Sequence, residues 1–157
     1  MTIKDKLAHY EPKPLGEKGR YAVLLPLIYD VKTDKYQILY QVRSEHISQP
    51  GEVSFPGGRV EDGETFQEAA IRETCEELNL IPDQIDIWGE IDYLIHQGRT
   101  THCFVGKINI ENWEDIHPNE EVKRLFTVYV DTLLTENPIY YKVISTLSDA
   151  KISHFSW

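Results

Sequence analysis

The chain has 157 residues, of which 41% are apolar, and a formal net charge of −10. This length and apolar content suit one buried core, so we expect a single domain over residues 1–157. The negative charge argues against binding to nucleic-acid polymers, whose affinity rests on neutralising phosphates with Lys and Arg, but it permits a small anionic ligand that needs only local positive charge.

The sequence offers no candidate for a membrane anchor or an export signal. The longest apolar run, residues 21–29, is interrupted by Pro26 and is far shorter than the ~20 residues that cross a bilayer. We recognise no signal peptide. Cys75 and Cys103 lie in dissimilar contexts without zinc-ligand spacing. We therefore expect reduced thiols in a cytoplasmic protein without membrane contact, and the sequence leaves a homodimer open.

The predicted elements are mostly strands. Runs rich in β-branched and aromatic side chains predict strands at residues 21–29, 36–42, 85–96, 101–110 and 124–130. The first two form a hairpin around residues 30–35, and the third and fourth form a pair around residues 97–99. Helices are expected at residues 2–10, at residues 65–78 and in a short segment that begins with Asp131 as its N-cap.

The helix expected at residues 65–78 gathers acids on one side. Residues three and four apart are neighbours on a helix, so Glu73, Glu76 and Glu77 lie within one turn. Ala69 and Ala70 lie near the same side, where their small side chains would leave room for ions and phosphate. The core face is expected on the opposite side, formed by Ile71, Thr74, Cys75 and Leu78.

Two interpretations of these acids are open: they either solvate an exposed face or bind a cation. Glu73 and Glu77 form a like-charged pair four residues apart, which costs a few tenths of a kcal/mol. Acids in the last turns of a helix also oppose its dipole, at about 0.3–1 kcal/mol each. A bound cation would offset both costs, which favours a metal site.

The spacing of the whole segment is more specific than the acids alone. It reads glycine, five residues, glutamate, seven residues, and then Arg-Glu-x-x-Glu-Glu. This segment resembles the Nudix box of MutT-like hydrolases, which act on nucleoside diphosphates linked to another group. The matching positions are Gly58, Glu64, Arg72, Glu73, Glu76, Glu77 and Leu80. Asn79 replaces the usual glycine and Thr74 the usual aliphatic residue; asparagine is the next-best residue for a left-handed C-cap.

The resemblance covers about residues 20–136 and implies the Nudix fold, an α+β architecture in which helices sandwich a mixed sheet (α/β/α). The tail at residues 137–157 is atypical. The resemblance also implies Mg²⁺ or Mn²⁺ as cofactor, a choice that suits hard oxygen ligands. Glu76 and Glu77 would then be metal ligands, Glu73 a ligand or the base that activates water, and Arg72 the residue that holds the glutamates by charge-assisted hydrogen bonds.

The resemblance suggests two further metal ligands beyond the helix, the carbonyl of Gly58 and the side chain of Glu121. Glu64 is expected to support the junction of loop and helix and is not a ligand. Nudix enzymes also recruit a carboxylate from a distant loop, and Glu121, which precedes a valine, matches that pattern. The alternative for Glu121 is a solvated acid in an acidic loop.

Residues 43–58, upstream of the box, resemble the extra motif of the coenzyme A pyrophosphatase branch. The resemblance rests on Arg43-Ser44, Gly51 and the run from Phe55 to Gly58, whereas Ser48 stands where a basic residue is usual. We expect substrate binding by Arg43, Ser44, Gly57 and Gly58, because an arginine fork suits phosphate and glycines let backbone amides approach an anion. Alternatively, Arg43 is an ordinary surface residue and the glycines form only a tight turn.

The expected function is metal-dependent hydrolysis of a pyrophosphate bond in a small nucleotide, with coenzyme A or a derivative as substrate. The products would be 3′,5′-ADP and 4′-phosphopantetheine. One alternative keeps the chemistry and takes ADP-ribose, dinucleotides or nucleoside triphosphates. A second alternative is a noncatalytic ligand-binding Nudix module.

Overall fold

A computed structural model describes residues 2–10 and 15–140. Its strands are β1 (Gly19–Asp30), β2 (Lys35–Arg43), β3 (Val53–Ser54), β4 (Gly57–Arg59), β5 (Ile85–Glu90), β6 (Leu94–His96), β7 (Arg99–Ile108) and β8 (Val122–Tyr129). Its helices are α1 (Ile3–Ala8), α2 (Phe66–Leu78) and α3 (Val130–Thr135), with 3₁₀ turns at Pro82–Gln84 and Trp113–Asp115. In this part of the chain no helix is long and apolar enough to cross a membrane.

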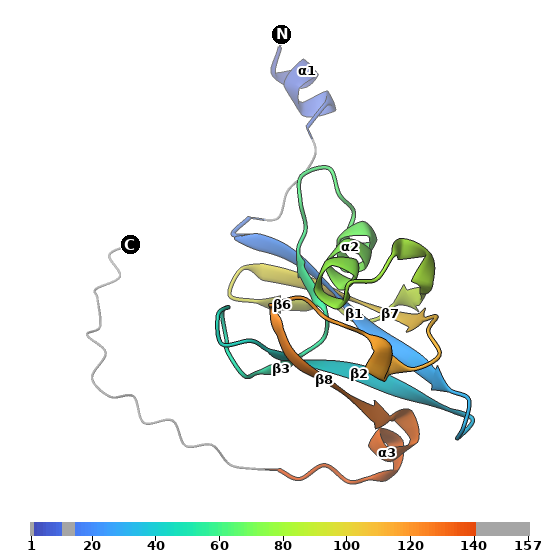
Figure 1. Cartoon of the computed structure of the whole chain (residues 1–157). Coiled ribbons are helices and arrows are strands. Elements are labelled where there is room, and N and C mark those ends of the chain that lie inside the picture. Colours follow the sequence, from blue (N-terminus) through green and yellow to red (C-terminus); the bar gives the residue numbers. More distant parts are fainter. Residues whose placement is uncertain (1, 11–14, 141–157) are drawn as a thin grey trace, which may run out of the picture.

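The strands form one mixed sheet with α2 lying across it (Figure 1). The order along the sheet is β3-β2-β1-β7-β5, and β4, β6 and β8 pair with β1, β7 and β2, respectively. β1 runs antiparallel to β2 and parallel to β7. The mixed sheet and both predicted strand pairs are confirmed, and the α+β class follows. Two short strands, β3 and β4, were not expected.

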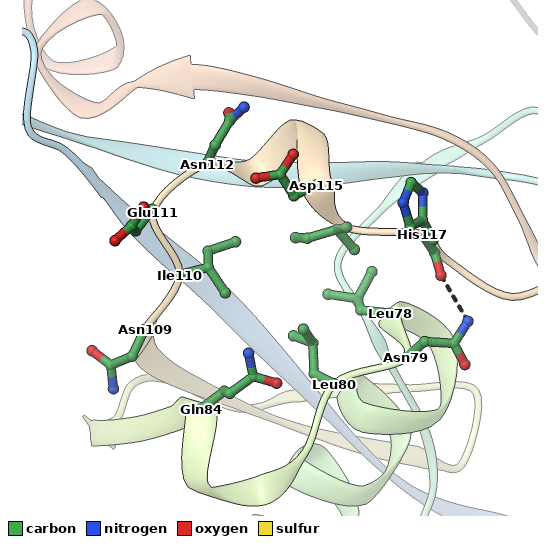
Figure 2. Close-up of a pocket in the computed structure, with 11 residues that line it drawn as sticks. Leu78, Asn79, Leu80, Gln84, Asn109, Ile110, Glu111, Asn112, Asp115 and His117 are labelled. Atoms are coloured by element: carbon green, nitrogen blue, oxygen red, sulfur yellow. Dashed lines mark hydrogen bonds between the residues drawn. The ribbon is translucent and has the colours of Figure 1, made fainter.

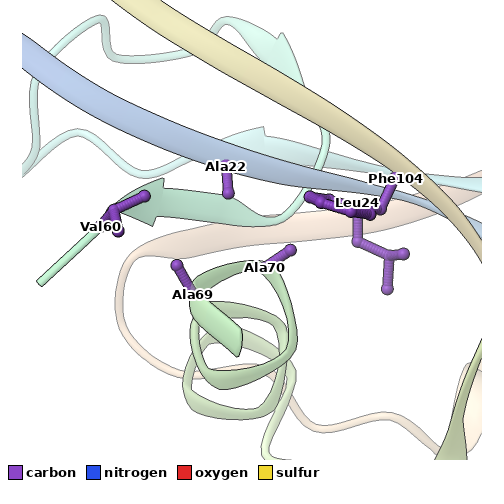
Figure 3. Packing of buried hydrophobic residues seen from close by; sticks show 6 residues of the cluster. All are labelled: Ala22, Leu24, Val60, Ala69, Ala70 and Phe104. Atoms are coloured by element: carbon purple, nitrogen blue, oxygen red, sulfur yellow. The ribbon is translucent and has the colours of Figure 1, made fainter. Parts of the chain in front are cut away.

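Successive side chains of β1 point to opposite faces of the sheet. Ala22 and Leu24 are fully buried toward α2, whereas Tyr21 and Val23 on the opposite face are only partly buried. Figure 3 shows the buried cluster of Ala22, Leu24, Val60, Ala69, Ala70 and Phe104 between helix and sheet. Small side chains at the contact let the helix backbone approach the strands closely.

The expected division of α2 into an acidic face and a core face is wrong in part. Ala69 and Ala70, predicted to leave room for ions, are fully buried against the sheet. Thr74 and Leu78 are buried as expected, and Glu77 is buried with them. The physical reason is that the sheet packs against the side of the helix that carries Ala70 and Thr74, and Glu77, seven residues after Ala70, lies on that same side.

The ends of the helices show which capping predictions hold. Thr65 caps α2 in a reciprocal capping box with Glu68, and Asn79 adopts the left-handed conformation expected of a C-cap, with φ 51° and ψ 46°. The N-cap prediction for Asp131 is wrong, because α3 begins at Val130 and Tyr129 holds the cap position, two residues before Asp131. Asp131 instead pairs with Lys35 at 2.9 Å.

Helix α1 forms where it was expected, but none of its residues is buried. Most of the predicted atypical tail, residues 141–157, lies outside the described residues. Both that prediction and the single-domain prediction for residues 1–157 therefore stay predictions.

Close helix–sheet packing predicts a steep cost for enlarging Ala70. Ala70→Leu forces extra methylene groups into a filled interface, so the free energy of unfolding should fall by about 1–3 kcal/mol. Urea unfolding followed by circular dichroism measures this. Gln67→Leu, at an exposed position of the same helix, is the control and should change stability by less than about 0.5 kcal/mol. Equal effects of the two variants would contradict the packing argument.

Candidate functional site

Glu77 is the most buried of the helix acids, with 4% of its surface exposed. Its Oε2 accepts hydrogen bonds from Gln41 Nε2 at 2.9 Å and from the backbone N–H of Gly57 at 3.1 Å. The bonds come from β2 and β4, so the sheet fixes the direction of this carboxylate. Gln41 is itself buried, and its own Oε1 lacks a hydrogen-bond partner within the described residues.

Burial makes this cluster of carboxylates electrostatically unusual. Removal from water raises the pKa of Glu77 to about 7, although the hydrogen bonds from Gln41 and Gly57 act in the opposite direction. Burial also raises the pKa of Glu73, despite the favourable contact with Arg72. The negative charge of Glu121 raises the pKa of both groups further. A cation at this position would stabilise the ionised forms.

Arg72 gathers the other acids of the box. Its Nε and Nη2 donate to the two oxygens of Glu64 at 2.8 and 3.0 Å, and Nη1 donates to Glu73 at 2.9 Å and Glu76 at 3.3 Å. Nη2 also donates to the carbonyl oxygen of Arg59 at 3.0 Å. The structure therefore places Arg72 where the sequence prediction puts it, and the fork on Glu64 ties the preceding loop to the helix.

Gly58 lets Glu73 lie directly against β4. A Cβ atom built on Gly58 would fall 2.4–2.5 Å from the carboxylate atoms of Glu73, closer than any real contact. A side chain at this position would displace Glu73. The glycine is thus required for the acid to approach the strand, and it is a paired strand residue rather than part of a tight turn.

The loop that carries Glu121 is fastened to the end of α2. Asn79 Nδ2 donates to the carbonyl of His117 at 2.7 Å, a contact visible in Figure 2 at the edge of a pocket near the C-terminus of α2. The backbone N–H of Asn119 donates to the carbonyl of Glu77 at 2.8 Å. These bonds bring Glu121 near the helix acids, from which it is 44 residues or more apart in sequence.

The donor set fits a divalent metal, because carboxylate oxygens are the ligands that Mg²⁺ and Mn²⁺ prefer. The raised pKa of buried Glu77 and the cradle at Gly58 agree with a cation beside them. Within residues 2–10 and 15–140, however, no three His, Cys, Asp or Glu side chains are already grouped to hold a metal ion. Arg72 draws Glu73 and Glu76 to itself, and half-exposed Glu76 has room to turn away.

A hollow of about 630 Å³ opens on the other side of the glycine strand. Its lining consists of Tyr21, Val23, Arg43, Ser48, Gln49, Ser54, Phe55, Gly57, Gly58, Arg99 and Thr101. The lining includes two arginines and no acid, in a chain whose net charge is −10. Gly58 belongs both to this hollow and to the carboxylate cluster, so an anion in the hollow would lie next to the acids.

The substrate-binding residues predicted from the sequence separate in the structure. Arg43, Gly57 and Gly58 line the hollow. The hydroxyl of Ser44 is buried without a hydrogen-bond partner among the described residues, and Ser44 is not part of the lining; its backbone N–H donates to the carbonyl of Glu121 at 2.8 Å. Ser44 thus links the upstream segment to the loop of Glu121.

Arg43 also braces the loop that follows it. Its Nε donates to the carbonyl of Ser48 at 2.8 Å and its Nη2 to the hydroxyl of Ser48 at 3.3 Å. Sequence reasoning missed Arg99, Tyr21 and Phe55, which also line the hollow. Arg99 was assigned to the turn expected at residues 97–99. For Tyr21, strand alternation alone did not show which face of β1 is not covered by α2.

A sequence model described as the NUDIX domain matches residues 19–147. The chain belongs to the Nudix family. Nudix hydrolase 3 from Caenorhabditis elegans is 37% identical over 118 residues, which cover 72% of this chain and 48% of that protein. The peroxisomal coenzyme A diphosphatase NUDT7 from Mus musculus is 30% identical over 161 residues, which cover 97% of this chain and 67% of that protein.

Among solved structures, the Nudix hydrolase RenU from M. smegmatis is similar with a TM-score of 0.62 and 21% identity, covering 74% of each chain. This likeness shows the fold alone. The Nudix family and the Nudix fold are confirmed, as is the resemblance to the coenzyme A branch. The match to Nudix hydrolase 3 spans about half of that protein's length.

The buried Glu77 predicts an unusual pH dependence of stability in metal-free buffer. Its folded pKa of about 7 lies above the ordinary 4.5, so the folded state holds the proton more tightly and loses stability as pH rises through this window. Between about pH 5 and pH 8, wild type should lose on the order of 3 kcal/mol relative to Glu77→Gln. Chemical denaturation at each pH, with chelator present, measures the difference.

The control for this measurement is Glu111→Gln, which neutralises an exposed acid and should leave the pH profile of wild type unchanged. Saturating Mg²⁺ should restore the stability of wild type at pH 8, because a cation favours the ionised carboxylate. A stability difference between wild type and Glu77→Gln that does not vary with pH would contradict the raised pKa.

Proposed function

We propose that this Nudix protein is a Mg²⁺- or Mn²⁺-dependent hydrolase that cleaves the pyrophosphate bond of a small nucleotide by attack of water on phosphorus. The observation that carries the proposal is the shared glycine strand. On one side of Gly58 lie carboxylates suited to a divalent cation, and on the other lies a hollow lined by arginines without acids.

In this proposal the metal is held by Glu73, Glu76, Glu77, Glu121 and the carbonyl of Gly58. When bound, the cation would neutralise the pyrophosphate and lower the pKa of the attacking water. The chain itself fixes the direction of the buried carboxylate and holds the box helix against its loop. Glu73, half-buried with a raised pKa, is suited either to hold the cation or to accept the proton from water.

Two buried or paired side chains position these groups. Gln41 donates to Glu77 and so orients a ligand without adding charge. Arg72 joins Glu64 to Glu73 and Glu76. We assign both to positioning, and Arg72 contributes to catalysis through the acids that it holds.

Coenzyme A or a derivative is the substrate that we propose, giving 3′,5′-ADP and 4′-phosphopantetheine. The upstream segment that contains Arg43 supports this choice, as does the relative named as a coenzyme A diphosphatase. ADP-ribose, dinucleotides and nucleoside triphosphates are the alternatives with the same chemistry. A Nudix module that binds a ligand without hydrolysing it is the noncatalytic alternative. We keep the single domain and the cytoplasmic location as proposals, although the relative is named peroxisomal.

Metal ligation predicts a large loss of turnover on neutralising the helix acids. With Mg²⁺ present, Glu76→Gln and Glu77→Gln should each lower kcat by about a hundredfold or more while the fold, followed by circular dichroism, persists. Chromatography of products from coenzyme A, ADP-ribose, NADH, diadenosine polyphosphates and nucleoside triphosphates provides the measurement. Glu111→Gln, an exposed acid outside the cluster, should retain wild-type rates.

Each outcome of this panel is informative. Release of 3′,5′-ADP from coenzyme A, with much weaker cleavage elsewhere, supports the substrate proposal. Preference for another nucleotide keeps the chemistry and removes coenzyme A. Binding of nucleotides without any metal-dependent turnover supports the noncatalytic module instead.

Arg43 offers a separate test of the hollow. Arg43→Ala removes a cation from the lining and the brace on Ser48, so KM should rise about tenfold or more with a smaller change in kcat. Arg43→Lys keeps the charge but not the planar fork and should recover part of the loss. An unchanged KM in Arg43→Ala, measured by initial rates, would return Arg43 to an ordinary surface role.

A further inference from the structure

Arg99 and Tyr21 form a pair at the edge of the hollow. The first residue of β7, Arg99, lies beside Gly19 of β1 in the parallel register. The ring of Tyr21 lies back over Gly19, where an added Cβ would come within 2.8 Å of Tyr21 Cε2. The guanidinium carbon of Arg99 is 5.8 Å from the centroid of this ring, within the range of a cation–π contact. Tyr21 thus holds the arginine over the open face of the sheet.

Apart from its contact with the Tyr21 ring, the guanidinium of Arg99 is unpaired among the described residues. In the part of the chain that the structure describes, no carboxylate pairs with Arg99 and its guanidinium donates no hydrogen bond to another residue. This differs from Arg72, which binds three acids, and from Arg43, which braces Ser48. An exposed cation in a hollow without acids is suited to an anionic group.

This position is separate from the carboxylate cluster. Gly58 on β4 pairs with Ala22 of β1, and Arg99 on β7 lies on the other side of β1 beside Gly19, three residues further along that strand. Two strand spacings and this offset place the two Cα atoms roughly 14 Å apart. A pyrophosphate beside Gly58 would therefore leave Arg99 for another part of the same ligand. The long arginine side chain points along the same face as Tyr21 and Thr101, which also line the hollow.

Resting on the hydrolase function proposed above, we infer that Arg99, positioned by Tyr21, binds a phosphate monoester on the ribose of the substrate, separate from the pyrophosphate. Such a group carries about −1.5 to −2 charges at pH 7. The planar guanidinium matches its oxygens with two parallel hydrogen bonds. Arg99 would thereby select ribose-phosphorylated nucleotides, and nucleotides with a free ribose would leave the arginine without its partner.

The kinetic test compares coenzyme A with dephospho-coenzyme A, which lacks only the monoester. In Arg99→Ala, kcat/KM for coenzyme A should fall about ten- to a hundredfold through KM, with a much smaller loss for dephospho-coenzyme A. Arg124→Ala is the matched control, because Arg124 also lies over an aromatic ring, that of Phe126 at 5.3 Å, outside the lining of the hollow. The control should keep the wild-type ratio between the two substrates.

Tyr21 has its own readout. Tyr21→Leu should reduce the preference for coenzyme A over dephospho-coenzyme A through KM while kcat changes little, and Tyr21→Phe, which keeps the ring, should restore the preference. Loss of both substrates to the same degree in Arg99→Ala would overturn the inference, since Arg99 would then bind a group that the two substrates share.

A binding measurement separates this inference from the proposed function. Isothermal titration calorimetry with Mg²⁺ present compares 3′,5′-ADP with 5′-AMP; neither contains a pyrophosphate bond, so the measurement requires no turnover. Wild type should bind 3′,5′-ADP about tenfold more tightly or better, and Arg99→Ala should remove the difference. If the chain cleaves no substrate yet keeps an Arg99-dependent preference, the hydrolase proposal fails and the monoester site stands. If wild type shows no preference, the monoester site is refuted.

Discussion

The site depends on the burial of one carboxylate. Glu77 lies in the interface between α2 and the sheet, where an ionised group is costly unless a partner or a cation compensates it. The structure provides two neutral donors, from Gln41 and Gly57, and neither carries a positive charge. The interface is therefore stable with a proton or a cation on this acid. In the proposed function a divalent metal ion would take this place, because its charge would offset the cost of burying the ionised acid.

The close packing around this acid has a common cause in small residues. Ala69 and Ala70 bring the helix near the sheet, and Gly58 lets the carboxylate of Glu73 approach the strand backbone. A larger side chain at any of these three positions would push the acids outward, where water would screen them. An added Cβ on Gly57 would instead collide with Ala22 and Val23 of β1. The hydrophobic contact between helix and sheet thus also determines the electrostatics of the site, because it sets how deeply the carboxylates are buried.

Much of this arrangement could be predicted from the sequence, and the failures have definite physical reasons. The spacing of Arg72, Glu73, Glu76 and Glu77 fixes their neighbourhood on a helix, since that follows from the helical repeat alone. Which side of the helix meets the sheet depends on tertiary packing, and the expected core face was wrong in part for that reason: Thr74 and Leu78 are buried, but so are Ala69 and Ala70. Strand β4 escaped notice because glycines have low strand propensity and its pairing with β1 is a long-range contact. Ser44 lies outside the lining of the hollow, and its backbone bond to Glu121 follows a bulge in the register of β2 and β8 that local pattern does not reveal. Its role in substrate binding stays a prediction.

Charge is distributed unevenly, and this distribution explains how an acidic chain can bind an anionic ligand. The net charge of −10 describes the whole surface, yet a ligand in the hollow meets Arg43 and Arg99 at short range and no acid in the lining. At physiological ionic strength, exposed charges more than about 8 Å away are largely screened, so the lining dominates. The carboxylates on the far side of Gly58 would repel the same ligand until a cation neutralises them. Each of the two ligands is therefore expected to strengthen the binding of the other, because the positive metal ion and the negative nucleotide would lie on the two sides of β4 and attract each other.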